Sequence, residues 1–349
     1  MRYRQLGRTD IKVSEVGFGC WTMGGPNWNI DSGMSVGWAE VDMDEVVAGI
    51  KAGLDAGVNH WDNADAYGNG KAERRLAWAF KKLGVKRESQ VIATKVGHFR
   101  GTAPFAYEPR HIRNQCEQSL KNLASEYIDI YYFHHGTYTG PGYDDPHGEP
   151  HDYLFEAAGV MHDLVKEGKV RAVGQSAYTE EDFERAVPVV KPDVLQNKAN
   201  MRYDAFIRPG SRTQRLMQHH GCTFVAFGPL DQGILLDKFD PERPPRFGEG
   251  EYRANRKDFN PGTLAHVHVK LEALRGRMEQ RAREQGASYA SETELFSSAA
   301  TRWVLGHERV CSAIPGFRND TQARMNVRAG VDPAMSPEDV EWCRRLFAE

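Results

Sequence analysis

The chain has 349 residues, of which 40% are hydrophobic and 27% are charged, and its formal net charge is −3. This composition allows a large core, and the absence of a basic block argues against nucleic acid or an anionic membrane as a partner. The five cysteines are scattered and form no CxxC pair, which is typical of reduced thiols. The sequence opens with MRYRQLGRTD, which lacks the apolar core of a signal peptide, and it contains no run of 18 apolar residues. We therefore expect a cytoplasmic protein.

An N-terminal hairpin is predicted first, because residues 2–6 and 11–13 alternate in polarity around a Gly-Arg-Thr-Asp turn. Short apolar runs bounded by turn residues then predict eight strands, at residues 13–21, 58–62, 91–95, 128–133, 170–176, 193–196, 223–227 and 310–315. Apolar residues at helical spacing predict helices at residues 42–54, 76–83, 109–123, 154–166, 264–285 and 292–305. Further helices are predicted after Thr179, after Asp320 and from Ser336 onward.

This alternation of strands and helices predicts the fold class α/β, as a closed (β/α)8 TIM barrel with an N-terminal β-hairpin and an extra C-terminal helix. No GxGxxG motif follows an early strand, so a Rossmann domain is not indicated. The sequence has no repeat and no linker, and we expect residues 1–349 to form a single domain. The loop from His135 to Asp152 is too long for a simple connector and is expected to belong to the substrate site.

Polar side chains stand where three successive strands end. These are Asp62, Lys95 and His134, and Tyr67 follows the first of them in a glycine-rich turn. In a parallel barrel the carboxyl ends of the strands form the active face, so these four residues are candidates for catalysis. Lysine is rarely buried without a partner, which strengthens the case for Lys95. The alternative is structural: Asp62 would cap the next helix, and Tyr67 would pack its ring.

A metal site is a second alternative, built from His60, Asp62, Asp65, His134 and His135. Barrel hydrolases place histidine and aspartate at strand ends. No HxH or HExxH spacing supports such a ligand set here, and we predict no metal.

The four candidate residues, in this order and at these strand ends, make the chain resemble an aldo-keto reductase. The resemblance spans nearly the whole chain and rests on several motifs together: YRQLGRT at residues 3–9, DNADAYG at 62–68, TK at 94–95, DIYYFH at 129–134, GKVRAVG at 168–174, GPLDQG at 228–233 and IPG at 314–316. It implies an NAD(P)H-dependent oxidoreductase that reduces an aldehyde or ketone, with the reverse oxidation also possible. A slow-turnover NADPH-binding regulatory subunit on the same barrel is the alternative.

The resemblance assigns a role to each of the four residues. Tyr67 is the general acid, and a nearby ammonium group is expected to lower the pKa of its hydroxyl. Lys95 supplies that ammonium, and Asp62 pairs with Lys95 so that the buried cation is tolerated. His134 orients the carbonyl group.

Cofactor contacts are also carried over from the family, position by position. Ser176 and Gln196 match the residues that bind the nicotinamide amide, although Ala177 replaces the usual neighbouring asparagine. Phe227 stands where the family usually has a tyrosine that stacks on the ring, and Met325 replaces a common acid. The remaining expected contacts are Leu230, Gln232 and Lys238, with help from Arg253, near the pyrophosphate, and Gly316, Arg318, Gln322 and Asn326 near the adenosine. The expected cofactor is NADP(H), possibly NAD(H), because Arg318 precedes a helix and can bind the 2′-phosphate.

The substrate is expected to be a small carbonyl or alcohol, and the sequence does not identify it. Trp21, Trp28, Tyr138 and Tyr143 suggest a pocket with aromatic walls. The pocket could suit a sugar, an inositol-like polyol, a polycyclic ketone or an aromatic aldehyde.

Overall fold

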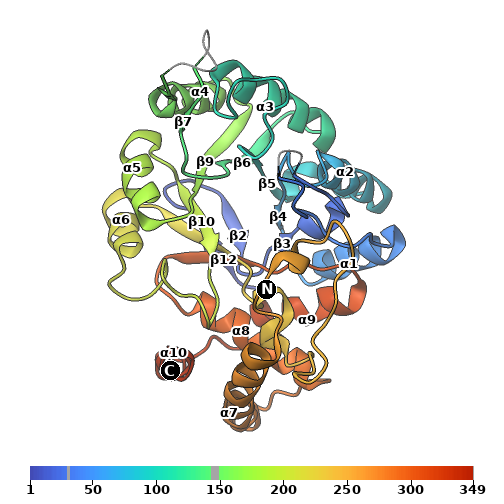
Figure 1. The fold of residues 1–349 in the computed structure, drawn as a ribbon. Coiled ribbons are helices and arrows are strands. Elements are labelled where there is room, and N and C mark those ends of the chain that lie inside the picture. Colours follow the sequence, from blue (N-terminus) through green and yellow to red (C-terminus); the bar gives the residue numbers. More distant parts are fainter. Residues whose placement is uncertain (30–31, 143–148, 349) are drawn as a thin grey trace.

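The predicted barrel is present in a computed structural model that describes residues 1–29, 32–142 and 149–348 (Figure 1). Eight parallel strands form one sheet whose order follows the chain. Isolated parallel bridges from Val16 to Ala313 and from Gly19 to Gly316 join the last strand to the first. The barrel strands are β3 (Phe18–Gly19), β4 (His60–Asp62), β5 (Val91–Val96), β6 (Ile128–Phe133), β9 (Val170–Ser176), β10 (Val194–Lys198), β11 (Thr223–Phe227) and β12 (Val310–Ile314).

Helices cover the outside of the barrel, as Figure 1 shows. They are α1 (Met43–Asp55), α2 (Lys71–Leu83), α3 (Pro109–Leu123), α4 (Leu154–Lys166), α5 (Glu180–Val190), α6 (Arg212–His220), α7 (Pro261–Gln285), α8 (Glu292–Leu305), α9 (Asp320–Val331) and α10 (Pro337–Ala348). Thr179 and Asp182 form a capping box at the start of α5, which explains why that helix begins there. Within the described part of the chain, no helix is long and apolar enough to cross a membrane.

The predicted hairpin, β1 (Tyr3–Gln5) and β2 (Lys12–Ser14), covers the amino-terminal end of the barrel. Its apolar side chains Leu6 and Ile11 are buried in one cluster with Val91 and Val194, the first residues of β5 and β10. Glu15 then accepts hydrogen bonds from the guanidinium groups of both Arg2 and Arg4, each at 2.8 Å. The hairpin closes this end, so only the carboxyl end of the barrel is left to form a site.

Two segments differ from the expected elements, and the long loop after β6 contains a feature that was not predicted. Residues 13–21 are not one strand: β2 belongs to the hairpin, β3 covers only Phe18–Gly19, and η1 (Trp21–Gly24) is a short 3₁₀ helix. Helix α6 was not predicted, because the segment Arg212–His220 has only two large apolar residues, Leu216 and Met217. The loop from His135 to Asp152 contains a short antiparallel pair, β7 (Thr139–Gly140) and β8 (His151–Asp152).

A strap crosses the carboxyl end of the barrel between β11 and α7. It contains the 3₁₀ helices η3 (Asp231–Leu236) and η4 (Tyr252–Asn255). Glu251 forms a bridge with Gly37, and the Tyr252 N–H donates to the Gly37 carbonyl at 2.9 Å. The strap is therefore held against the loop that follows η1, and both segments contribute side chains to the mouth of the barrel.

His60 makes the barrel interior sensitive to pH. It is fully buried in β4, its Nδ1 lies 3.0 Å from the Ser312 hydroxyl, and its Nε2 has no partner. Burial lowers the pKa of His60 to about 4. The unfolded chain, with an ordinary histidine pKa near 6.5, binds the proton more readily, so this contribution to stability is present above about pH 6.5 and is lost as the pH falls towards 4.

We expect the free energy of unfolding to fall by about 2 kcal/mol between pH 7.5 and pH 5 because of His60 alone. Urea denaturation of the wild type and of His60→Gln at both pH values measures this share, since the variant lacks the titrating ring. His219→Gln, a change at a histidine outside the barrel interior, should keep the wild-type slope. The expectation fails if His60→Gln loses as much stability on acidification as the wild type does.

Candidate active site

Asp62 and Lys95 form a buried ion pair at the carboxyl end of the barrel. Their side chains are 3% and 1% exposed, and Lys95 Nζ lies 2.5 Å from Asp62 Oδ1. The ammonium also donates to the Asn63 carbonyl at 2.7 Å and to the Tyr67 hydroxyl at 3.3 Å, so all three of its protons have acceptors. The second oxygen of Asp62 accepts the amide of Gln196 at 2.7 Å. The pair is fully hydrogen-bonded, which is what makes two charges tolerable at this depth.

Tyr67 is held over this pair by a tight turn that needs glycine. Gly68 has a φ of +59°, and a Cβ there would lie 2.4 Å from the carbonyl oxygen of Gly24. The turn can therefore pack against η1 only if residue 68 has no side chain. The ring of Tyr67 stacks on Trp21, with centroids 5.9 Å apart, and meets the edge of His134 at 5.8 Å.

The expected lowering of the Tyr67 pKa was wrong for this structure. Burial, followed by the negative charge of Asp62, raises the pKa of Tyr67 well above its usual value. Burial likewise lowers the pKa of Lys95, whereas Asp62 acts in the opposite direction. The physical reason is that Asp62 neutralises the ammonium, so the hydroxyl sees a nearly neutral pair in a dry environment. Tyr67 therefore keeps its proton throughout the neutral range.

His134 follows β6 and lies beside Tyr67. Its backbone N–H donates to the Val96 carbonyl at 2.9 Å, while its ring Nδ1 has no partner. Burial, then the neighbouring His98 and Lys95, lowers the pKa of His134 well below the usual histidine value. The ring is neutral, so it can both donate and accept a hydrogen bond.

Three predicted cofactor residues lie on adjacent strands at the same end of the barrel. Gln196 of β10 is paired in register with Ser176 of β9, and Phe227 ends β11 opposite Lys198. Phe227 is 38% exposed, so one face of its ring is available at the mouth. Gln196 uses its amide nitrogen on Asp62, which leaves its carbonyl oxygen to accept from another amide. The strand order thus places Ser176 and Gln196 side by side, as the sequence motif requires.

The loop after β11, where Leu230 and Gln232 lie, has an unusual backbone. Asp231, Gln232 and Gly233 all have positive φ, and the buried Gln232 Oε1 has no hydrogen-bond partner. The conformation is fixed by Asp231, which is 1% exposed and pairs with Arg202 and Arg256. The loop is therefore held in one shape that leaves an unpartnered amide oxygen.

Three cations gather at the start of α9. They are Lys238, Arg253 and Arg318: burial, then the charges of Arg253 and Arg318, lowers the pKa of Lys238. Arg253 is already paired with Glu251 and lies between the rings of Trp38 and Phe247. No ion pair of Arg318 is present among residues 1–29, 32–142 and 149–348. The cluster carries more positive than negative charge, which suits an anion.

Two other predicted adenosine contacts are used within the protein. The Gln322 side chain accepts the N–H of Arg318 at 3.0 Å, and Asn326, 3% exposed, donates to the Gly316 carbonyl at 3.1 Å. We expected both to contact the cofactor directly. Both side chains also support the loop from Gly316 to Arg318, and their expected contact with the cofactor stays a prediction.

The predicted substrate residues do not lie together. Trp21 faces the mouth beside Tyr67, and Trp28 is 48% exposed near the strap. Tyr138 is fully buried, and its hydroxyl donates to Gln175 at 2.5 Å. Its expected place in a pocket wall was therefore wrong, since no surface of the ring reaches the mouth. Tyr143 lies outside the described residues.

The sequence interpretation missed His98, Tyr252 and Cys20. His98 lies three residues after Lys95 and packs against His134, and Tyr252 packs on Trp21 with centroids 5.3 Å apart. Cys20 is buried close enough to Asp62 and Lys95 for their charges to act on its thiol. Only His98 had a signal in the sequence, because it lies two residues after the end of β5, the strand that carries Lys95. The part of the chain that the structure describes holds no group of three His, Cys, Asp or Glu side chains that could bind a metal.

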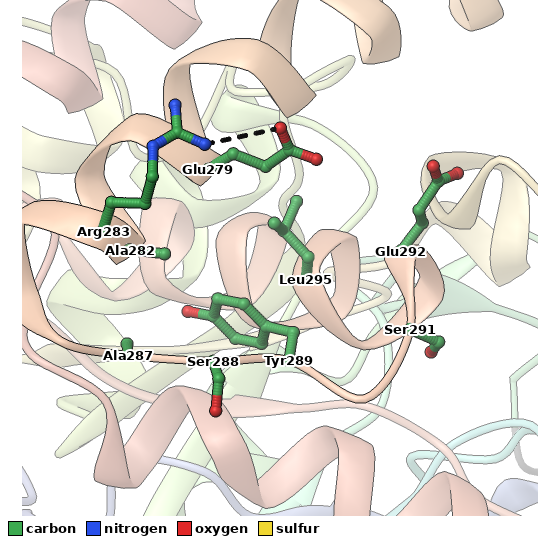
Figure 2. Close-up of a pocket in the computed structure, with 9 residues that line it drawn as sticks. All are labelled: Glu279, Ala282, Arg283, Ala287, Ser288, Tyr289, Ser291, Glu292 and Leu295. Carbon is green, nitrogen blue, oxygen red and sulfur yellow. Dashed lines mark ion pairs between the residues drawn. The ribbon is translucent and has the colours of Figure 1, made fainter.

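A separate pocket of about 310 Å³ lies between the end of α7 and the start of α8. Figure 2 shows Glu279 and Arg283 on one side of it and Glu292 on the other. None of the nine residues that line it is a predicted site residue, and all come from α7, α8 and the segment between them. The candidate active site is therefore the barrel mouth and not this pocket.

A parallel barrel with a hydrogen-bonded Asp–Lys pair, a tyrosine and a neutral histidine at its carboxyl end defines a barrel oxidoreductase. The model of the aldo/keto reductase family matches residues 15–347. The chain belongs to the aldo/keto reductase family, whose members use a nicotinamide cofactor and reduce small carbonyl compounds. The resemblance noted in the sequence and the predicted fold are both confirmed.

Known relatives span nearly the whole chain. A probable voltage-gated potassium channel subunit beta of Oryza sativa subsp. japonica is 27% identical, over 98% of this chain and 95% of that protein. An NADH-specific methylglyoxal reductase of Escherichia coli is 26% identical, over 94% of this chain and 93% of that protein. The solved structure of a glycerol dehydrogenase from Gluconobacter oxydans has a TM-score of 0.74 at 23% identity, over 99% of this chain and 95% of that one, which shows the shared fold.

Proposed function

We propose that this protein reduces an aldehyde or ketone to an alcohol by using NADPH, with the reverse oxidation also possible. The observation that carries the proposal is the contact of Lys95 Nζ with both Asp62 Oδ1 and the Tyr67 hydroxyl, at 2.5 and 3.3 Å. It places a protonated tyrosine and a charged pair at one point of the mouth. The bound nicotinamide would supply the hydride, and the protein must supply the proton.

Tyr67 supplies that proton in the proposed mechanism. When hydride reaches the carbonyl carbon, negative charge develops on the oxygen, and an alkoxide is a much stronger base than a phenolate. A tyrosine with a raised pKa can therefore still protonate it, and Lys95 stabilises the phenolate that is left. His134 helps to hold the carbonyl oxygen beside the Tyr67 hydroxyl through its Nε2, because its Nδ1 is buried.

Several features of the mouth fit a nicotinamide cofactor. Ser176 and Gln196 lie side by side and can bind a carboxamide, and the exposed face of Phe227 can take a flat ring. The side-chain amide N–H groups of Gln232 can donate to the pyrophosphate from the loop that Asp231 fixes. Lys238 and Arg318 are the groups with unmatched positive charge, and they would hold the 2′-phosphate.

Arg318→Ala is expected to raise the KM for NADPH about ten- to hundredfold and to leave that for NADH nearly unchanged. One lost charge-assisted hydrogen bond is worth about 1.5–3 kcal/mol, which corresponds to that range. The control is Arg324→Ala on α9, the helix that follows Arg318, where the arginine pairs with Asp320 at 2.8 Å and faces solvent. Equal weakening of both cofactors by Arg318→Ala would remove the support for an NADPH preference. The Escherichia coli relative is specific for NADH, so a preference for NADPH cannot be assumed from the family and needs this test.

A second candidate is a cofactor-binding regulatory subunit with slow turnover, which the similarity to a channel subunit beta favours. Both candidates would bind the cofactor, and they differ in the rate of carbonyl reduction. Steady-state oxidation of NADPH and of NADH, with a panel of aldehydes and ketones, tests them. Turnover at about 1 s⁻¹ or above supports an enzyme, whereas tight cofactor binding without such turnover supports the subunit.

A further inference from the structure

His98 lies directly above His134 at the mouth of the barrel. The two ring centroids are 4.2 Å apart, and part of the His98 side chain stays exposed although it lies only three residues after Lys95. Gly97 makes this approach possible: its φ is +146°, and a Cβ there would lie 3.1 Å from His134 Cβ and 2.7 Å from the Tyr107 hydroxyl. The end of β5 therefore fixes a second imidazole beside the one that serves catalysis.

The rings of His98 and His134 pack on each other and on neighbouring rings. His134 Nδ1 is buried without a partner, and within the described part of the chain neither His134 Nε2 nor the His98 ring forms a hydrogen bond. His135 differs, because its Nε2 lies 2.9 Å from the Gly97 carbonyl and its Nδ1 accepts the Thr137 N–H at 3.2 Å. His135 is thus structural, while the His98 ring and the Nε2 of His134 can form hydrogen bonds with a ligand.

Both free rings are neutral. Burial, then the neighbouring His135 and Lys95, lowers the pKa of His98, and burial together with His98 lowers that of His134. A neutral imidazole offers one donor and one acceptor, which is what a hydroxyl group needs and what a purely apolar substrate cannot use.

The opposite wall of the mouth is aromatic. Trp21 stacks on Tyr67 and packs against Tyr252, with centroids 5.9 and 5.3 Å apart. Asp182, whose charge acts on His135, is used at the start of α5, where it accepts the N–H groups of Tyr178 and Thr179. The free cations lie on the cofactor side, around Arg318. The wall next to His98 therefore suits a neutral substrate.

We infer that His98 is a substrate-binding residue that selects carbonyl compounds with a hydroxyl group on the carbon next to the carbonyl. Tyr67 and His134 would form hydrogen bonds with the carbonyl oxygen. The ring of His98, which is next to His134, would then form a hydrogen bond with the hydroxyl group on the adjacent carbon. The substrate class is thus a neutral α-hydroxy aldehyde or ketone. This inference rests on the proposed function.

Hydroxyacetone and 2-butanone form a matched pair for the test, because they differ only in a hydroxyl replaced by a methyl group. We expect His98→Phe, which keeps a ring against His134, to lower kcat/KM for hydroxyacetone about three- to tenfold. The value for 2-butanone should stay within about twofold. His98→Asn, which retains a donor and an acceptor, should recover part of the loss on hydroxyacetone. Arg100→Gln, at an exposed position on the same loop, should change neither substrate.

Three results would overturn the inference. Equal loss on both ketones in His98→Phe would show that the ring only shapes the mouth, and no loss on either would show that it does not touch the substrate. A wild-type protein that reduces 2-butanone and not hydroxyacetone would also exclude the selection, while the proposed function would stand. If the wild type reduces no aldehyde or ketone with either cofactor, the proposed function fails, and the inference fails with it.

Discussion

Replacing Tyr67 with phenylalanine is expected to slow carbonyl reduction by about 10²–10⁴-fold, the usual share of general acid catalysis. The change removes the hydroxyl that lies 3.3 Å from Lys95 Nζ and leaves the ring that stacks on Trp21. The proton source is lost while the packing of the mouth is kept. Cofactor affinity should therefore stay close to that of the wild type.

Single-turnover reduction with saturating cofactor isolates the chemical step in this comparison, and quenching of protein fluorescence measures cofactor binding. Tyr252→Phe is the matched control, because its ring also packs on Trp21 while no hydrogen bond joins its hydroxyl to Lys95. The role of Tyr67 is contradicted if Tyr67→Phe keeps more than half of the wild-type rate, or if Tyr252→Phe loses as much.

Lys95→Met is expected to lower the free energy of unfolding by about 3–5 kcal/mol and to remove most of the activity. Asp62 would remain buried, with only the Gln196 amide as a donor, and an uncompensated buried charge is costly. The Tyr67 hydroxyl would at the same time lose the cation that stabilises its phenolate. Urea denaturation near neutral pH measures the first effect, and reduction of a reactive aldehyde measures the second.

The double variant Asp62→Asn/Lys95→Met separates charge from packing. It removes both charges, so we expect it to regain about half or more of the lost stability while staying inactive. Stability unchanged in Lys95→Met would mean that the pair contributes little to the fold. Full activity in either variant would assign Lys95 a structural role only.

Local pattern was sufficient for most elements of the barrel. The apolar runs at β5, β6 and β9 are bounded by turn residues, and Thr179 with Asp182 sets the start of α5, so each could be predicted from its own residues. The prediction of one strand at residues 13–21 was wrong because the hairpin and the barrel each take part of that segment. Helix α6 was missed because it has only two large apolar residues, Leu216 and Met217, and the neighbours that it packs against cannot be read from its own sequence.

The sequence by itself determined the family, the barrel and the strand ends that carry Asp62, Lys95 and His134, because these depend on periodicity and on residues close in the chain. Only the tertiary structure decided which side chains meet across the barrel. Gln196 reaches Asp62 from a strand 134 positions away, His98 lies over His134, and Tyr138 is buried where a pocket wall was expected. It also decided the direction of the Tyr67 pKa, which depends on burial and on the neutralisation of Lys95 by Asp62. Such contacts depend on how the strands and loops pack around the mouth of the barrel. The spacing of residues along the chain determines neither this packing nor the burial of each side chain.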